Sequence, residues 1–250
     1  MPRIGLMHNL VIDIGNTNSK LGVFNSRELV YTQRVATLDT AILEEVLATY
    51  EVNNFTISSV SKDIDELVNF LQDKLNYVPF STQINAGIVN HYQSLATLGL
   101  DRWAKVIAAK RLYPNSNCLL IDAGTCITYD VLTDKSEYFG GSISLGIRMR
   151  FEALHHFTGK LPLIEWDQLQ NIPQGTNTAN AIKNGVLHGI VNEIGGFIAA
   201  ENAKNTNLLV LLTGGDANFL MEQLKNSIFA SQITHDPYLV LKGLNEVITL

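Results

Sequence analysis

The chain has 250 residues, 46% of them apolar, and a formal net charge of −6, so it can bury one large core or two of ordinary size. It has no cluster of lysines and arginines, which excludes nucleic acid as its main partner because phosphate-backbone binding needs a positive face. No apolar run reaches the roughly 18 residues of a membrane-spanning helix, which argues against a membrane partner.

The chain opens with a short extension and then a hairpin. Residues 1–9 contain no long apolar segment, so we expect neither a signal peptide nor a membrane anchor. Two apolar runs, at 10–14 and 21–24, flank the turn formers of residues 15–18, which predicts two strands joined by a tight turn. Asp13 and the N–H and hydroxyl donors after it can cradle a phosphate and its hydrated cation. In the alternative interpretation, the polar side chains only stabilise a surface turn.

Helices and strands then alternate. The residue patterns predict, in chain order, a strand at 28–35, a helix at 40–50, a strand at 55–60, a helix at 63–75 and a helix at 100–112. Strands followed by alternating helices and strands favour an α/β fold.

The opening pattern returns after a linker at 114–117. An apolar run ends in Asp122, Gly124 and Thr125 lead to a second strand, and a third strand is expected at 138–144. This internal repeat indicates two related halves that face each other. We assign them to two domains, residues 1–116 and 117–250.

Cys118 and Cys126 are the only cysteines, and each lies in or beside an apolar run. They form no C-x-x-C pair and no framework of the secreted type, so we interpret them as small buried hydrophobic residues. Such cysteine usage indicates a reducing compartment, the cytoplasm.

A long helix is predicted over 178–203, although Gly185, Gly189, Gly195 and Gly196 interrupt it. Because glycine inside a helix costs about 1 kcal/mol relative to alanine, these glycines indicate a close approach of another backbone. That backbone belongs either to this fold or to a second subunit, and the pattern favours neither.

Near the end of the chain, an apolar strand at 208–212 runs into Thr213-Gly214-Gly215-Asp216, followed by a helix at 218–224. A Gly-Gly turn before a helix allows a flat ligand to lie against bare backbone. A glycine turn without a ligand is the alternative.

Three of these motifs, in this order, resemble those of the actin-like ATPase superfamily of sugar kinases, heat-shock ATPases and acetate kinases. They are Asp13-x-Gly-Asn-Thr, Asp122-x-Gly-Thr and Thr213-Gly-Gly. In that superfamily the first two motifs grip the phosphates of a nucleotide and the third lies by the adenosine. The resemblance implies an α/β fold with two ribonuclease-H-like halves, mixed sheets and flanking helices.

A fourth segment narrows the resemblance to the type III pantothenate kinase family. Leu98-Gly99-x-Asp101-Arg102-Trp103 is similar to the family signature, residues 140–146 to its glycine loop, and residues 175–182 to its substrate threonine segment. Together the motifs span nearly the whole chain. Leu95 and Leu145 stand where the family usually has proline, a departure that bears on loop geometry.

The chemistry of Asp101 and Arg102 agrees with this resemblance. A kinase that acts on an alcohol needs a carboxylate to orient the hydroxyl and accept its proton. An arginine can bind a substrate carboxylate through two parallel hydrogen bonds. Pantothenate carries both groups. The alternative for Asp101 is helix N-capping, because it precedes the helical run at 103–110.

The resemblance also implies roles for individual residues. Asp101 is the implied catalytic base. The implied pantothenate-binding residues are Tyr92, Gly99, Leu100, Asp101, Arg102 and Thr178. The implied ATP-binding residues are Asp13, Ile14, Gly15, Asn16, Thr17, Asn18, Ser19, Lys20, Thr125, Gly214 and Gly215. Asp13 would hold Mg²⁺ through water, and Asp122 would hold a monovalent cation, K⁺ or NH₄⁺.

The implied reaction is the phosphorylation of pantothenate by ATP to 4′-phosphopantothenate, the first step of coenzyme A synthesis. The resemblance also implies a homodimer, and the glycine-bearing helix after Thr178 is the candidate contact. Two alternatives remain: a regulatory protein that binds ATP or pantothenate without turnover, and a kinase for another small hydroxy acid or a sugar. Intact Asp101 and Arg102 argue against the regulatory protein.

Overall fold

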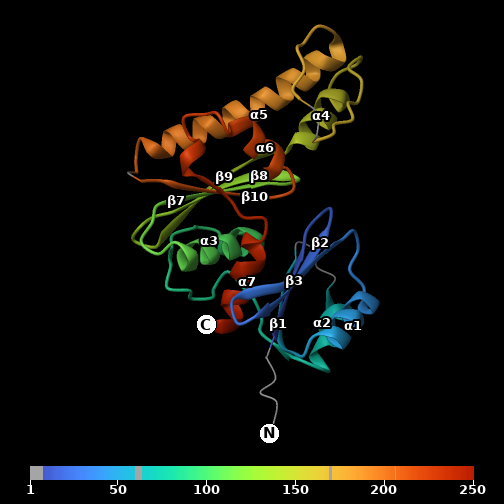
Figure 1. Ribbon diagram of the computed structural model, residues 1–250, viewed down its shortest axis with the longest axis vertical. Helices are drawn as coiled ribbons and strands as arrows, with labels where there is room; N and C mark the ends of the chain where they lie inside the picture. Colours follow the sequence, from blue (N-terminus) through green and yellow to red (C-terminus); the bar gives the residue numbers. More distant parts are fainter. Residues whose placement is uncertain (1–7, 60–63, 169–170, 206) are drawn as a thin grey trace. The chain divides into compact units, whose positions relative to one another are not determined.

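The computed structural model describes residues 8–59, 64–168, 171–205 and 207–250. The chain divides into two compact units, the first of Met1–Pro114 with Tyr238–Leu250 and the second of Asn115–Pro237. Figure 1 draws both units. No helix in the part of the chain that the structure describes is long and apolar enough to cross a membrane.

The first unit is built on a mixed sheet with the strand order β3-β2-β1-β4-β5. Its strands are β1 (His8–Ile14), β2 (Ser19–Asn25), β3 (Glu28–Val35), β4 (Val52–Ser59) and β5 (Asn76–Tyr77). β1 pairs antiparallel with β2 and parallel with β4. The remaining elements are helices α1 (Thr40–Thr49), α2 (Asp65–Gln72), α3 (Leu100–Leu112) and α7 (Leu239–Thr249), the short strand β6 (Val89–Asn90) and a 3₁₀ turn at Leu95–Thr97.

The second unit repeats this topology, with the strand order β9-β8-β7-β10-β11. Its strands are β7 (Cys118–Ala123), β8 (Cys126–Leu132), β9 (Glu137–Leu145), β10 (Leu209–Thr213) and β11 (Ile233–His235). β7 pairs antiparallel with β8 and parallel with β10, as β1 does with β2 and β4. Its helices are α4 (Ile147–His156), α5 (Thr178–Asn202) and α6 (Ala217–Leu224), with a 3₁₀ turn at Ala230–Gln232. The predicted α/β class, with two related halves and mixed sheets, is therefore confirmed.

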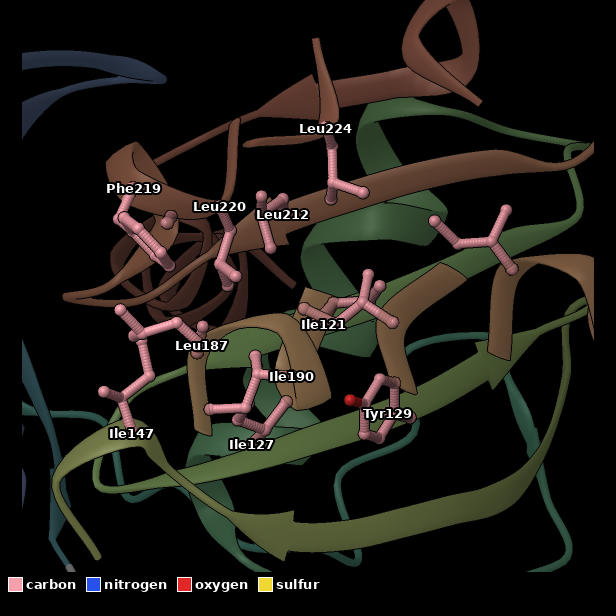
Figure 2. Packing of buried hydrophobic residues seen from close by; sticks show 14 of the residues in the cluster. Ile121, Ile127, Tyr129, Ile147, Leu187, Ile190, Leu212, Phe219, Leu220 and Leu224 are labelled. Atoms are coloured by element: carbon pink, nitrogen blue, oxygen red, sulfur yellow. The ribbon is translucent and has the colours of Figure 1, made fainter. Parts of the chain in front are cut away.

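The core of the second unit lies between its sheet and helices α5 and α6, which cover one face of the sheet (Figure 1). Ile121 and Ile127 project from β7 and β8 toward Leu187 and Ile190 of α5 (Figure 2). All four are at most 1% exposed. Burying each such side chain stabilises the fold by about 1.5–3 kcal/mol, so the core holds the strand ends that carry the second and third motifs in fixed positions.

Most predicted elements agree with the structure within a few residues. The predicted helix at 178–203 is α5, and the helix at 100–112 is α3. The predicted ends at Val60 and Asp63, and most of the extension 1–9, lie outside the described residues. Elements that the patterns did not predict are α4, α7 and the short strands β5, β6 and β11.

The last helix corrects the predicted second domain, 117–250. α7 belongs to the first unit, where it packs against α3 and β1. The two helices approach closely at Gly243, where a Cβ would lie 1.9 Å from the carbonyl oxygen of Ala104. Glu246 also accepts from Arg27 over 3.0 Å and lies 3.4 Å from Arg111. The chain therefore leaves the second unit before it ends.

A ladder of asparagine side chains ties α7 to the first sheet. Asn76 donates to Asn54 over 3.0 Å, Asn54 to Asn9 over 3.1 Å, and Asn9 to Asn245 over 3.0 Å. Asn245, which is 1% exposed, donates in turn to the carbonyl oxygen of Ser26 over 2.8 Å. Side-chain amides donate and accept at once, so each rung satisfies the next.

We expect Asn245→Ala to lower the free energy of unfolding by about 1–3 kcal/mol, because it leaves the buried Asn9 amide without an acceptor and removes the bond to the Ser26 carbonyl. Urea unfolding measures the loss. Asn69→Ala, which removes an exposed asparagine from α2, is the matched control and should change stability by about 0.5 kcal/mol or less. Equal losses in the two variants would contradict this role of the ladder.

Candidate active site

The first motif forms the predicted tight hairpin. β1 and β2 are joined by Gly15 to Asn18, and the Gly15 N–H donates to the Asn18 carbonyl over 3.1 Å. Gly15, Asn16 and Thr17 are exposed, whereas Asp13 is half-buried and pairs across the strands with Lys20. The turn therefore offers exposed backbone and hydroxyl groups beside one carboxylate.

The second motif occupies the equivalent place in the second unit. Asp122 is the next-to-last residue of β7, as Asp13 is of β1. The turn after it is closed by the Gly124 N–H, which donates to the Cys126 carbonyl over 3.0 Å. The Gly146 N–H donates to the Thr125 carbonyl over 3.1 Å, and a Cβ at Gly146 would lie 2.3 Å from that oxygen. The glycine loop before α4 thus supports the second motif directly.

A buried hydroxyl residue neighbours each acid on the parallel side of its sheet. Asp13 lies in register with Ser58 of β4, and Asp122 with Thr213 of β10. Ser58 and Thr213 are each 2% exposed. Sequence reasoning missed Ser58, although the internal repeat carried the signal, because β4 corresponds to β10.

The third motif is a turn that only glycine fits. Gly214 has φ +99°, and a Cβ there would lie 2.4 Å from the carbonyl oxygen of Ala123. The Asp216 N–H donates to the same oxygen over 2.9 Å. The second and third motifs are therefore joined through Ala123, which brings Asp122, Thr125 and the Gly214–Gly215 turn to one edge of the second sheet. Gly215 is exposed there.

Asp101 does not cap α3, so the N-capping alternative is wrong. The N-cap residue is Gly99, and α3 begins at Leu100 with no side-chain capping bond. Asp101 lies in the first turn, with its Oδ1 only 2.5 Å from where a Cβ on Gly99 would stand. Glycine at 99 therefore leaves room for this carboxylate.

Arg102 lies beside Tyr92. Its guanidinium carbon is 5.6 Å from the centre of the Tyr92 ring, within the range of a cation–π contact, and the residue is 4% exposed. The Tyr92 N–H is held by the Asn90 side chain over 3.0 Å. The first unit thus brings Tyr92, Gly99, Asp101 and Arg102 together, as predicted. Asn90 was missed, although an asparagine two residues before a loop N–H is typical of an Asx turn.

Thr178, by contrast, lies in the second unit as the first residue of α5. Asn177 caps this helix by accepting from the Asn180 N–H over 2.9 Å. Thr178 lines a largely apolar groove of about 780 Å³ between α4 and α5. Its other lining residues are Leu145, Arg150, Ala153, Leu154, Phe157, Thr158, Leu161, Ala181, Ile182, Gly185 and Val186.

A polar network fixes α4 and β8 to α5 behind this groove. Arg150 donates to Glu193 over 2.5 Å and to Ser144 over 3.0 Å, and Tyr129 donates to Glu193 over 2.8 Å. Burial raises the pKa of Tyr129 well above its ordinary range, so its hydroxyl remains a donor. Burial also acts to raise the pKa of Glu193, but the hydrogen bonds from Arg150 and Tyr129 outweigh it and hold that pKa below its usual value.

The glycines of α5 meet no backbone of another element in the part of the chain that the structure describes. Among the described residues, nothing lies within 4 Å of a Cβ built on Gly185 or Gly196. A Cβ on Gly189 or Gly195 would meet only the tips of the Arg150 and Phe229 side chains. Internal packing of α5 therefore does not explain why these four residues are glycine.

Burial of Cys118 raises the pKa of its thiol to about 12, so the group stays protonated and unreactive. Cys126 is half-buried, with its Sγ 3.8 Å from the Sδ of Met149. Both cysteines therefore lie in the surroundings of packing residues.

The sequence profile of the Type III pantothenate kinase family matches residues 9–200. The chain belongs to this family. The Type III pantothenate kinase of Bacteroides fragilis is 41% identical over 244 residues, which cover 96% of this chain and 97% of that protein. That of Flavobacterium psychrophilum is 37% identical over 226 residues, with coverages of 89% and 92%.

A solved structure has the same fold as this chain. It is a Campylobacter jejuni protein described as a Baf family transcriptional activator, with a TM-score of 0.60 at 21% identity, covering 96% of this chain and 97% of that one. Membership in a kinase family implies ATP and a metal ion.

Proposed function

We propose that this chain transfers the γ-phosphoryl group of ATP to the primary hydroxyl of pantothenate, giving 4′-phosphopantothenate for coenzyme A synthesis. One observation carries the proposal: this member of the family has Asp101 in the first turn of α3, where it does not cap the helix, next to a buried Arg102. The pair matches a substrate that has a hydroxyl at one end and a carboxylate at the other.

Asp101 is the catalytic base in this proposal. Its carboxylate orients the substrate hydroxyl and accepts its proton as the phosphoryl group arrives. Arg102 binds the substrate carboxylate through parallel hydrogen bonds, with its guanidinium held in place by the Tyr92 ring. The backbones of Gly99 and Leu100 complete the pantothenate contacts at the start of α3.

The residues that we assign to ATP binding come from motifs of both units. The hairpin from Asp13 to Lys20 and Thr125 contact the phosphates, and Gly214 and Gly215 lie by the adenosine. The donor set fits hard cations, because a half-buried carboxylate stands beside exposed hydroxyl and backbone groups. Asp13 would hold Mg²⁺ through water, and Asp122 would hold K⁺ or NH₄⁺. These cations supply positive charge that neutralises the phosphates.

We also propose a homodimer that uses the α4–α5 face. Gly185 and Gly196 have open space where a second backbone can approach, and Gly185 lines the apolar groove with Thr178. Phe157, in the same groove, is 81% exposed. A partner subunit on this face would cover the apolar surface and place Thr178 at the contact.

A coupled assay of ADP release tests the proposed reaction. With ATP, Mg²⁺ and K⁺, we expect pantothenate to stimulate turnover to a rate on the order of 1 s⁻¹ or more, the usual range for kinases. Replacing K⁺ by Na⁺ should lower that rate. Binding of ATP and pantothenate without ADP release would favour the regulatory protein. Turnover with other hydroxy acids or sugars and none with pantothenate would favour a different kinase.

A further inference from the structure

A segment between α4 and α5 contacts the Gly214–Asp216 turn. The side-chain amide nitrogen of Gln168 donates to the Gly215 carbonyl over 3.0 Å and to Asp216 Oδ1 over 2.8 Å. An amide nitrogen carries two hydrogens, so it can make both bonds. The flipped amide would place its oxygen against two acceptors, which determines the end that faces the turn.

Trp166 anchors this segment to the helix that follows the turn. Its ring meets that of Phe219 edge-to-face, with the centroids 5.1 Å apart and the planes at 81°. Phe219 lies in α6 and is 3% exposed, and Leu161 and Ile164 of the same segment pack on the same core. The chain is therefore anchored to the core at Trp166, two residues before Gln168.

The two glycines of this turn depend on contacts from other segments for a fixed arrangement. Gly214 and Gly215 have no side chains to pack, and glycine has more backbone freedom than any other residue. The hydrogen bond from the Asp216 N–H to the Ala123 carbonyl fixes the turn against the end of β7. Gln168 holds the exposed Gly215 carbonyl and the Asp216 carboxylate.

We infer that Gln168 is a positioning residue of the nucleotide site, which holds the Gly215–Asp216 backbone in the arrangement that accepts the adenosine of ATP. This inference rests on the proposed function, in which Gly214 and Gly215 contact that adenosine. Gln168 lies at the adenosine turn and not in the group of Tyr92, Asp101 and Arg102. Its loss therefore weakens nucleotide binding and leaves acceptor binding and phosphoryl transfer unchanged.

Steady-state kinetics of Gln168→Ala test this role. The KM for ATP should rise about tenfold, because the turn loses both hydrogen bonds from Gln168, one of them to a charged group, while kcat and the KM for pantothenate stay within about twofold. Gln168→Glu should raise the KM for ATP further, because its carboxylate would face the Asp216 carboxylate. Gln223→Ala, a half-buried glutamine of α6, is the matched control and should leave all three constants unchanged.

A binding measurement provides a second readout that does not need turnover. The Trp166 ring packs against Phe219 of α6, the helix that follows the turn, so its emission should respond to rearrangement there. ADP is titrated while tryptophan emission is followed, with Trp166→Phe as the reference. Gln168→Ala should weaken ADP binding about tenfold, as it weakens ATP.

The outcomes separate this inference from the proposed function. If wild type phosphorylates pantothenate and Gln168→Ala has unchanged ATP and ADP affinity, the inference is wrong and the function stands. If Gln168→Ala raised the KM for ATP and the KM for pantothenate equally and lowered the unfolding temperature, the residue would be purely structural and the inference would be wrong. Wild type that neither binds ADP nor turns over ATP would overturn the proposed function itself.

Discussion

Asp101→Asn should lower kcat by a factor of about 10²–10⁴, the usual contribution of a positioned general base. The amide keeps the size of the carboxylate and its place beside Gly99, but it cannot accept the proton of the substrate hydroxyl. KM values for ATP and pantothenate should change little, because Arg102 and the phosphate motifs are intact. Turnover in the coupled ADP-release assay measures the loss.

Asp65→Asn is the matched control for this variant. Asp65 is one of two acids in the first turn of α2, and Asp101 is the acid in the first turn of α3, so each substitution removes one favourable charge from a helix N-terminus. Asp65 is exposed, and its replacement should leave kcat unchanged. Undiminished turnover in Asp101→Asn would show that another group accepts the proton.

Gly214→Ala should destabilise the second unit by about 3 kcal/mol and abolish measurable ATP binding. Alanine would have to adopt φ +99°, and its Cβ would stand 2.4 Å from the Ala123 carbonyl oxygen. The Ala123 oxygen belongs to the backbone, so it cannot rotate away as the end of a flexible side chain could. The turn must therefore move off β7, and the bond from the Asp216 N–H to Ala123 is lost with it. Urea unfolding and ADP titration measure the two effects.

Gly159→Ala makes the same substitution where there is room. Gly159 is exposed and nothing in the described residues lies within 4 Å of its Cβ position, so stability and binding should change by about 0.5 kcal/mol or less. A Gly214→Ala variant that bound ADP as wild type does would contradict the role of this turn.

Local patterns were sufficient for the elements that carry the motifs. Strand periodicity on both sides of a polar turn predicted the hairpin around residues 15–18, and its repeat predicted β7 and β8. Helical spacing predicted α3 and α5, because amphipathic periodicity is set by residues within a few turns of one another. The short strands β5, β6 and β11 were missed because two or three residues carry no measurable period.

The candidate site was only partly predictable, because local patterns do not report contacts between residues far apart in the chain. Tyr92, Gly99, Asp101 and Arg102 lie within eleven consecutive residues, and their grouping was correctly expected. Gln168 was missed because its two partners lie 47 and 48 residues further along the chain. No local pattern around an exposed glutamine indicates which backbone carbonyl it will reach.

The sequence by itself determined the type and order of the main elements and the family to which they belong. Turn chemistry and hydrophobic period are local properties, and the motifs keep a distinctive order. Only the tertiary structure decided that α7 returns to the first unit, that Asp101 is not a cap, and that Gln168 holds the glycine turn. The positions of α7 and Gln168 depend on contacts between distant segments, such as the bond from Asn9 to Asn245 across 236 residues. Such contacts form because burial and hydrogen-bond satisfaction are optimised over the whole unit.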